Sequence, residues 1–258
     1  MRQESWLDNT VLDFQDFLLF GKYCKLSNFL FGALLFPIWL LRGPDQKHRR
    51  NRQGVVASRK TKKAEMFLKE SMLKMAQCQS IIEVGSGRPF EKELVPYCGL
   101  FANCNWKTLD IRPEAHPNIV DDITQSRIAT ASVDGVVCKS IFEHIAEAQK
   151  AADEIYRILK PRGRIFSYVP FLHPYHATQK YGDYYRFSAE GIKHLLRHFA
   201  AIEVCATEAP LSSILGILLG PELLKRLAHI FVHPLDSILL RKGWMSKTTS
   251  GYYVYAEK

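Results

Sequence analysis

Short apolar runs recur along the middle and the end of the chain, and each predicts a buried strand. The runs have four to six residues, include many β-branched or aromatic side chains, and are bounded by acids, glycines or other turn residues. The predicted strands are residues 81–84, 106–110, 118–123, 133–138, 164–169, 201–206 and 252–256.

Helical periodicity fills the gaps between these strands. Apolar residues recur every three or four positions in 64–75, 148–159 and 192–199, and residues 90–100 can also form a helix. Pro161 and Gly163 end the second of these stripes. Strands that alternate with helices predict an α/β fold with a doubly wound, mostly parallel sheet.

The first strand runs directly into the turn Glu83-Val84-Gly85-Ser86-Gly87. Glycine accepts a positive φ and lets a ligand lie against bare backbone. Asp110 ends the second strand and can accept hydrogen bonds from both hydroxyls of a ribose, although a turn or cap aspartate is the alternative. The carboxyl ends of these two strands therefore predict a nucleoside site.

These residues, together with later motifs, resemble the class I S-adenosylmethionine-dependent methyltransferases, in particular the type-11 methyltransferase domain. The resemblance covers residues 78–207 and the C-terminal tail, about half of the chain. It implies a seven-stranded sheet whose last strand is antiparallel, with S-adenosylmethionine as cofactor. The matching motifs are the acid-x-Gly-x-Gly turn Glu83–Gly87, the ribose acid Asp110, the adenine-flanking pair Asp122-Ile123, the strand Asp134–Cys138 with Ser140–His144, and Leu159–Gly163.

The resemblance also implies which residues hold the cofactor. Arg88 and Pro89 replace the small residues that commonly follow the second glycine, so the local turn is expected to differ. Without a third glycine, a dinucleotide oxidoreductase is disfavoured, because such enzymes bring a helix N-terminus against a pyrophosphate. The expected cofactor-binding residues are Glu83, Gly85, Ser86, Gly87, Asp110, Ile111, Asp122, Ile123, Lys139, Ser140 and His144.

The segment after the fifth strand carries the candidate catalytic residues His176, His173, Asp183 and Arg186. In the family this loop closes over the acceptor, and an imidazole can take a proton from an acceptor hydroxyl. The alternative is that the loop residues only pack. His173 and His176 have a spacing that could bind a metal, but no third ligand is evident at helical spacing, so no metal site is predicted.

Two apolar additions flank the predicted domain. Residues 29–41 form an uninterrupted apolar run of 13 residues, whereas a spanning helix needs roughly 20. This run is expected to lie at a membrane interface or to cover the domain. A second, helical insertion at 208–250 precedes the last strand. The predicted organisation is an N-terminal extension, 1–63, followed by a methyltransferase domain, 64–258.

Charge favours the membrane interpretation of the extension. The chain carries +9, and the nine Lys/Arg between Arg42 and Lys63 face a single acid, Asp45. Such a cluster beside an apolar anchor is attracted to anionic lipid headgroups by about 1 kcal/mol per residue. Nucleic acid is less favoured as a partner, because the excess charge belongs to one segment and does not spread over a face.

Cysteine usage indicates the compartment. The six cysteines are scattered and form no Cys-x-x-Cys pair, and residues 3–20 are acidic and unlike a secretory leader. Reduced thiols in a cytoplasmic protein are therefore expected, with peripheral association at the inner membrane face.

Together these features favour methyl transfer to a hydroxyl of a glycan, lipid-linked or isoprenoid-like acceptor at the cytoplasmic membrane face. Two alternatives stay open. One is a catalytically inactive, membrane-associated protein that keeps its nucleoside pocket. The other is a nucleic-acid methyltransferase, which only the basic run supports.

Overall fold

A computed structural model describes residues 60–90, 92–209, 211, 214, 232, 235, 236, 238 and 248–258. The chain divides into two units, Met1–Val55 and Val56–Lys258, and the described residues belong to the second. The predictions for residues 1–59 and for most of the insertion 208–250 lie outside the described residues.

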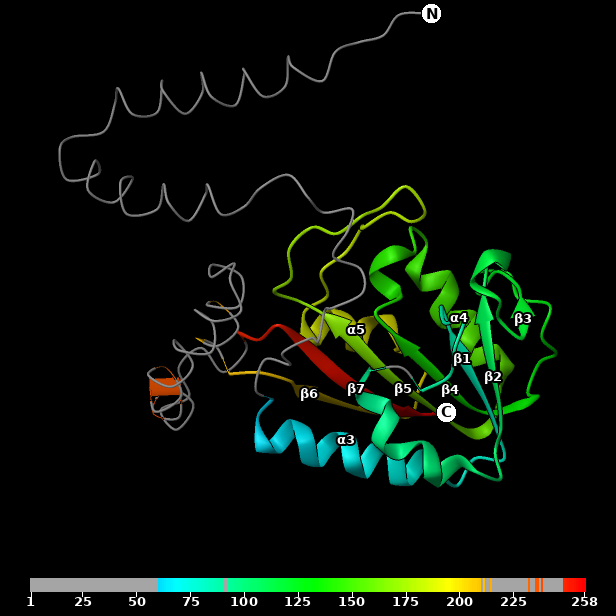
Figure 1. Ribbon diagram of the computed structural model, residues 1–258, viewed down its shortest axis with the longest axis horizontal. Coiled ribbons are helices and arrows are strands. Elements are labelled where there is room, and N and C mark those ends of the chain that lie inside the picture. Colours follow the sequence, from blue (N-terminus) through cyan, green and yellow to red (C-terminus); the bar gives the residue numbers. More distant parts are fainter. Residues whose placement is uncertain are drawn as a thin grey trace, which may run out of the picture. The chain divides into compact units, whose positions relative to one another are not determined.

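Within the described residues, seven strands form one sheet with the spatial order β3-β2-β1-β4-β5-β7-β6 (Figure 1). Neighbouring strands from β3 to β5 pair in parallel, whereas β7 is antiparallel to both β5 and β6. The predicted mostly parallel sheet with an antiparallel last strand is confirmed. The strands are β1 Ser80–Val84, β2 Asn105–Asp110, β3 Ile119–Val120, β4 Val133–Lys139, β5 Leu159–Pro170, β6 Ala201–Ala206 and β7 Gly251–Glu257.

Helices cover both faces of this sheet (Figure 1). On one face lie α3, Lys62–Met75, and the 3₁₀ helix η1, Lys92–Phe101, while α4, Ala148–Ile158, and α5, Ala189–Leu195, lie on the other. β7 shows the double cover, because Tyr253 packs in the α3 cluster and Val254 packs in the α4 cluster. The sheet is thus doubly wound. Because both faces are covered by helices, a ligand can reach the sheet only at the ends of its strands.

Several element boundaries differ from the sequence-based prediction for local reasons. β3 has two residues and not six. At its start the Asn118 side chain accepts the Thr108 N–H at 2.9 Å in place of a ladder bond, and after Val120 the chain turns where Asp122 accepts the Thr124 N–H. α4 ends at Ile158 and Leu159 begins β5, since Pro161 disfavours the helical conformation for the residue before it. η1 is 3₁₀ helix around Pro96, which has no N–H to donate.

Helix α5 is also shorter than the apolar stripe that predicts it. α5 ends at Leu195, yet Leu196 and Phe199 remain buried beside Ile192 in the core. The apolar pattern therefore marked burial correctly beyond the point where the helix stops.

The insertion before β7 is described at a few positions. Asp236 is buried, and its Oδ1 accepts the Leu211 N–H at 2.8 Å. In the described segments, every helix is too short or too polar to cross a bilayer. The described helical residues of the insertion are Leu211, Ile214, Val232, Leu235, Asp236 and Ile238.

Candidate active site

Three parallel strands end side by side and form the edge on which the site is built. Val84, the last residue of β1, is level with Leu109 in β2 and with Cys138 in β4. The Gly85 N–H continues this pairing by donating to the Leu109 carbonyl at 2.6 Å. The glycine turn, Asp110 and the Lys139-Ser140 segment therefore meet at the carboxyl edge of the sheet, where ligands bind in open α/β sheets.

The glycine turn has no room for side chains. Gly85 has φ +74°, and an added Cβ would overlap the Ile141 side chain; a Cβ on Gly87 would overlap the backbone carbonyl oxygen of Ala115. Glu83 is buried and holds the turn from beneath, because its Oε2 accepts from the Phe90 N–H at 3.2 Å and from Trp106 Nε1 at 3.0 Å. Both positions therefore require glycine, because atoms of Ile141 and Ala115 lie where a side chain would begin.

Asp110 is almost completely buried, at 3% exposure, and Arg112 covers its carboxylate. Oδ1 accepts from the Arg112 N–H at 2.9 Å and from Nε at 3.0 Å, while Oδ2 accepts from Nη2 at 2.8 Å. Burial alone would raise the pKa of Asp110, but the Arg112 hydrogen bonds outweigh burial and leave that pKa below its usual value. Asp110 is therefore an anionic acceptor whose oxygens are shared with a neighbouring guanidinium.

The next predicted cofactor residues divide into exposed and internal groups. Ile111 is 62% exposed beside Asp110 and can offer an apolar surface. Ile123 packs in the core, so its side chain is not part of an open surface. Asp122 accepts the Thr124 N–H and hydroxyl at 2.8 Å each, which shapes the turn after β3.

The remaining predicted residues follow the glycine turn or β4. The Ser86 hydroxyl turns back to the Arg88 backbone. Lys139 Nζ lies 3.6 Å from Glu93 Oε1. Ser140 has φ +52°, a strained conformation for a residue with a side chain, and its N–H donates to Tyr168 O at 2.8 Å. The fold brings the predicted cofactor residues to one edge, with Ile123 and Glu83 directed into the protein.

The predicted catalytic loop closes on a buried ion pair. The Asp183 side chain is fully buried, and both of its oxygens accept from Arg186, with Nη2 to Oδ2 at 2.7 Å. Hydrogen bonding from this guanidinium holds the pKa of Asp183 well below its usual range. Arg186 also donates to the carbonyls of His173, Pro174 and Tyr185, so its observed contacts lie inside its own loop.

Asp183 also orients His176. Its Oδ2 accepts the His176 backbone N–H at 2.9 Å and lies 3.2 Å from His176 Nδ1. The His173 ring packs edge-on against the His176 ring with centroids 4.5 Å apart. The structure thus brings together the four predicted catalytic residues. Asp183 contacts His176, and Arg186 fixes Asp183, so these two residues position the imidazole.

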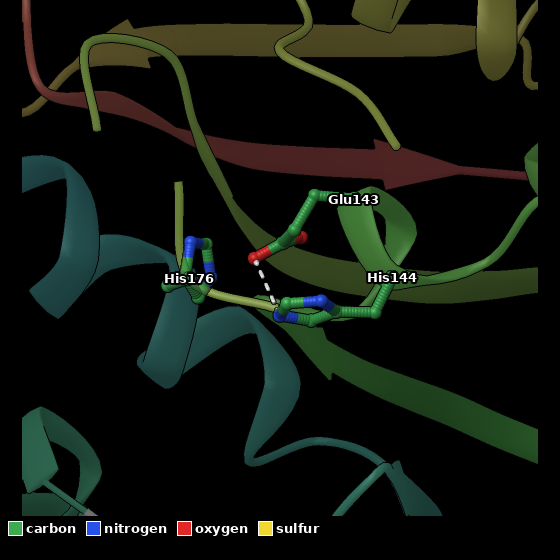
Figure 2. A group of neighbouring side chains, drawn as sticks. All are labelled: Glu143, His144 and His176. Atoms are coloured by element: carbon green, nitrogen blue, oxygen red, sulfur yellow. Dashed lines mark ion pairs between the residues drawn. The ribbon is translucent and has the colours of Figure 1, made fainter. Parts of the chain in front are cut away.

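Glu143 and His144 lie beside His176 and come from the turn after β4, the 3₁₀ helix η3, Phe142–His144 (Figure 2). His144 Nδ1 lies 2.5 Å from the Gly182 carbonyl, and its Nε2 lies 3.8 Å from Glu143 Oε1. The His144 and His176 ring centroids are 4.7 Å apart. We call Glu143, His144, His173 and His176 the histidine cluster.

Burial favours the neutral form of two imidazoles of this cluster, those of His144 and His173. Burial lowers the pKa of His144 and of His173 below the ordinary histidine value, so each ring is available as a proton acceptor near neutral pH. Glu143 belongs to the sequence motif Ser140–His144, but the sequence does not predict it as a site residue. Its position directly before His144 was the available signal, although only the fold shows that it lies beside His176.

Two loops meet above the edge. The Arg112 guanidinium lies 5.9 Å from the centre of the Tyr181 ring, and Lys180 Nζ lies 3.7 Å from Glu114 Oε1. The first contact is within the range of a cation–π interaction. The loop after β5 therefore touches the loop that covers Asp110, which links the candidate acceptor side to the candidate cofactor side.

Comparison with known proteins agrees with this arrangement. Residues 101–167 match a protein-family model described as "Methyltransferase domain", a segment that contains Asp110, Asp122, Ser140 and His144. No curated protein matched the sequence.

Solved methyltransferase structures are similar at low identity. One is an S-adenosylmethionine-dependent methyltransferase from Archaeoglobus fulgidus, 14% identical with TM-score 0.48, which covers 76% of this chain and 94% of that chain. A second is phosphoethanolamine N-methyltransferase 2 from Haemonchus contortus with S-adenosyl-L-methionine, 16% identical with TM-score 0.41, over 70% and 48% of the chains. A third, 1,6-didemethyltoxoflavin-N1-methyltransferase from Burkholderia thailandensis with S-adenosylhomocysteine, is 11% identical with TM-score 0.43, over 75% and 81%. At these values the acceptors of those proteins carry no information about the acceptor of this chain.

Proposed function

Since the chain carries a class I S-adenosylmethionine-dependent methyltransferase domain and is an enzyme of that kind, we propose that its acceptor is a hydroxyl group. The molecule that bears it is a glycan, a lipid-linked sugar or an isoprenoid-like compound handled at a membrane surface. The observation that carries the proposal is the histidine cluster at the edge of the sheet.

The residues of the edge fit the cofactor. Gly85 and Gly87 pack directly against Ile141 and Ala115, and the Gly85 N–H bond to Leu109 holds the turn at the carboxyl end of β2, next to Asp110. Asp110 would hold the ribose hydroxyls and Ile111 would offer an apolar surface to the base, with the backbone of Lys139 and Ser140 alongside. When bound, the cofactor supplies a methyl group on a sulfonium whose carbon–sulfur bond breaks with the electron pair staying on sulfur.

A hydroxyl acceptor needs what this cluster offers. Its oxygen becomes a good nucleophile as its proton is withdrawn, and a positioned base contributes roughly a hundred- to ten-thousandfold. His144 and His173 are held neutral by burial, and Asp183 orients His176. As the oxygen–methyl bond forms, the hydroxyl proton is therefore received within the histidine cluster.

The acceptor class is tested by methyl transfer in fractionated cell extract. Purified protein with radiolabelled cofactor is expected to label a lipid or glycan fraction, and the label should resist mild alkali, which cleaves methyl esters but not ethers. The control is the Asp110→Ala variant, which should label the extract much less at a cofactor concentration near the wild-type dissociation constant. Label confined to RNA or protein, or recovered as N-methyl groups after hydrolysis, would contradict the proposal.

The membrane location rests on the sequence of the N-terminal extension. The 13-residue apolar run 29–41 stands next to the basic stretch 42–63, and screening by salt weakens attraction to anionic lipid while leaving apolar insertion intact. The full chain is expected to float with anionic liposomes more than with neutral ones, and high salt should release part of it.

A charge-matched comparison makes this prediction specific. Replacing Arg49, Arg50 and Arg52 by Gln should reduce flotation with anionic liposomes. Replacing Lys69, Lys107 and Lys193, which are exposed on the domain, should change it little. Equal flotation of the wild type with neutral and anionic liposomes would remove the electrostatic part of the proposal.

A further inference from the structure

We propose that Glu143, His144 and His176 bind a divalent transition-metal ion. Each residue offers one ligand atom, and these three atoms all lie within 4.8 Å of one another (Figure 2). Two imidazoles and one carboxylate are the donor set of three-ligand metal sites that keep a position open for water or substrate. The sequence predicted no metal site, because the third ligand lies in the turn after another strand.

The spacing of the ligand atoms is close to that of an occupied site. Metal–nitrogen and metal–oxygen bonds of about 2.0–2.2 Å place two tetrahedral ligands roughly 3.3–3.5 Å apart. His144 Nε2 and Glu143 Oε1 are 3.8 Å apart, so this pair needs to close by less than half an ångström. All three ligand atoms lie within 4.8 Å of one another, so binding requires His176, on the loop after β5, to move closer to the other two.

The His144 and His176 imidazoles each have an oxygen partner at one ring nitrogen, as metal-ligating histidines do. His144 Nδ1 lies 2.5 Å from the Gly182 carbonyl, which places the proton on Nδ1 and leaves the Nε2 lone pair toward Glu143. His176 lies against the fully buried Asp183 carboxylate, which Arg186 fixes in turn. A carbonyl or carboxylate on the second ring nitrogen of a ligating histidine sets its tautomer and orientation.

The donor set also selects the kind of ion. Mg²⁺ and Ca²⁺ prefer oxygen ligands, whereas Mn²⁺, Fe²⁺, Co²⁺ and Zn²⁺ accept imidazole nitrogen beside a carboxylate. Glu143 is fully buried, and buried charges in proteins are paired or coordinate metals, so a cation here would stabilise its ionised form. The ion expected is therefore a first-row divalent transition metal.

The consequence for catalysis rests on the proposed function. A metal in this position would bind the acceptor oxygen and lower the pKa of its hydroxyl, which is Lewis-acid activation. The hydroxyl proton then passes to the His173 imidazole, whose ring packs against that of His176 but which is not one of the three ligands. The oxygen–methyl bond forms as the carbon–sulfur bond breaks.

The test is a titration of the full-length, chelator-treated protein with Co²⁺, followed by visible absorption and calorimetry, and repeated with Mn²⁺ and Zn²⁺. One equivalent is expected to bind with the absorption of a nitrogen- and oxygen-ligated Co²⁺ ion. His176→Ala and His144→Ala should each weaken binding at least a hundredfold. Asp183→Asn should weaken it roughly ten- to a hundredfold, as the loss of an outer partner does.

His198→Ala is the matched control, because His198 is half-exposed and pairs with Asp153 away from the cluster. It should bind Co²⁺ like the wild type. Thermal unfolding of each variant separates lost ligands from lost fold, and His176 carries the test if the more buried His144→Ala variant does not fold. Wild-type protein that binds no Co²⁺ at millimolar concentration, or His176→Ala that binds it normally, would overturn the proposal.

The two proposals fail separately. Metal binding is measured without acceptor or cofactor, so its absence overturns the metal site and leaves hydroxyl methylation standing. A protein that binds the metal but labels only amines in the extract assay overturns the hydroxyl acceptor alone.

Discussion

His176→Ala is expected to lower acceptor turnover by roughly a hundred- to ten-thousandfold while leaving the affinity for S-adenosylmethionine nearly unchanged. His176 is 29% exposed, is oriented by Asp183 and lies in the histidine cluster, and among the described residues it forms no hydrogen bond, ion pair or ring contact with the glycine turn or Asp110. A side chain that takes part only when the acceptor reacts should affect kcat and kcat/KM together. The measurement is steady-state kinetics with the identified acceptor, alongside calorimetric binding of S-adenosylhomocysteine.

Two further variants give this prediction its controls. His198→Ala removes a histidine outside the cluster and should leave both turnover and cofactor affinity near the wild-type values. Asp183→Asn keeps the shape of the carboxylate but weakens its hold on His176 and Arg186, so turnover should fall by less than in His176→Ala. If His176→Ala turns over its acceptor at the wild-type rate, the loop only packs and the acceptor site lies elsewhere, with the insertion 208–250 as the next candidate.

Much of the fold could be predicted because its determinants are local. β6 falls on the predicted residues, and β1, β2, β4 and β7 differ by one or two residues at their ends. Most successive residues of these strands are buried, and a run of apolar residues in the sequence predicts that burial directly. β3 could not be predicted correctly, because the side chains of Asn118 and Asp122 bond to backbone N–H groups at its two ends, and a propensity argument does not foresee these bonds.

The site was predictable only where it follows strand ends. Asp110 and the glycine turn are fixed by parallel pairing, which brings the carboxyl ends of β1 and β2 together whatever the loops do. Contacts between loops have no such rule. The approach of Glu143 to His176 and the cover of Asp110 by Arg112 depend on side-chain directions that spacing does not encode.

Asp110→Ala is expected to weaken binding of S-adenosylhomocysteine by roughly ten- to a hundredfold, whereas Arg112→Ala should strengthen it by about two- to fivefold. A hydrogen bond to a charged group contributes about 1.5–3 kcal/mol, and Asp110 is the carboxylate that would hold the ribose hydroxyls. Arg112 donates to both oxygens of that carboxylate, so a ribose has to compete with it for these acceptors. The pair is partly exposed on the arginine side and is therefore worth about 0.2–1 kcal/mol, which sets the smaller gain.

The two variants are expected to change the affinity for S-adenosylhomocysteine in opposite directions. This result would show that Arg112 competes with the ribose for Asp110 and does not merely support the site. If Arg112 only braced the loop, its removal would weaken binding in the same direction as Asp110→Ala. Calorimetric titration with S-adenosylhomocysteine measures both changes. At a hundredfold excess of ligand over its dissociation constant, the free energy of unfolding of the wild type should rise by about 2.7 kcal/mol, and the matching rise in Tm confirms saturation. Asp153→Ala, in α4, and Arg197→Ala, just after α5, each remove one charge on the face covered by these two helices. They serve as charge-matched controls and should leave the affinity for S-adenosylhomocysteine unchanged. Weaker binding in Arg112→Ala would show that the guanidinium supports the site and does not compete with the cofactor for Asp110.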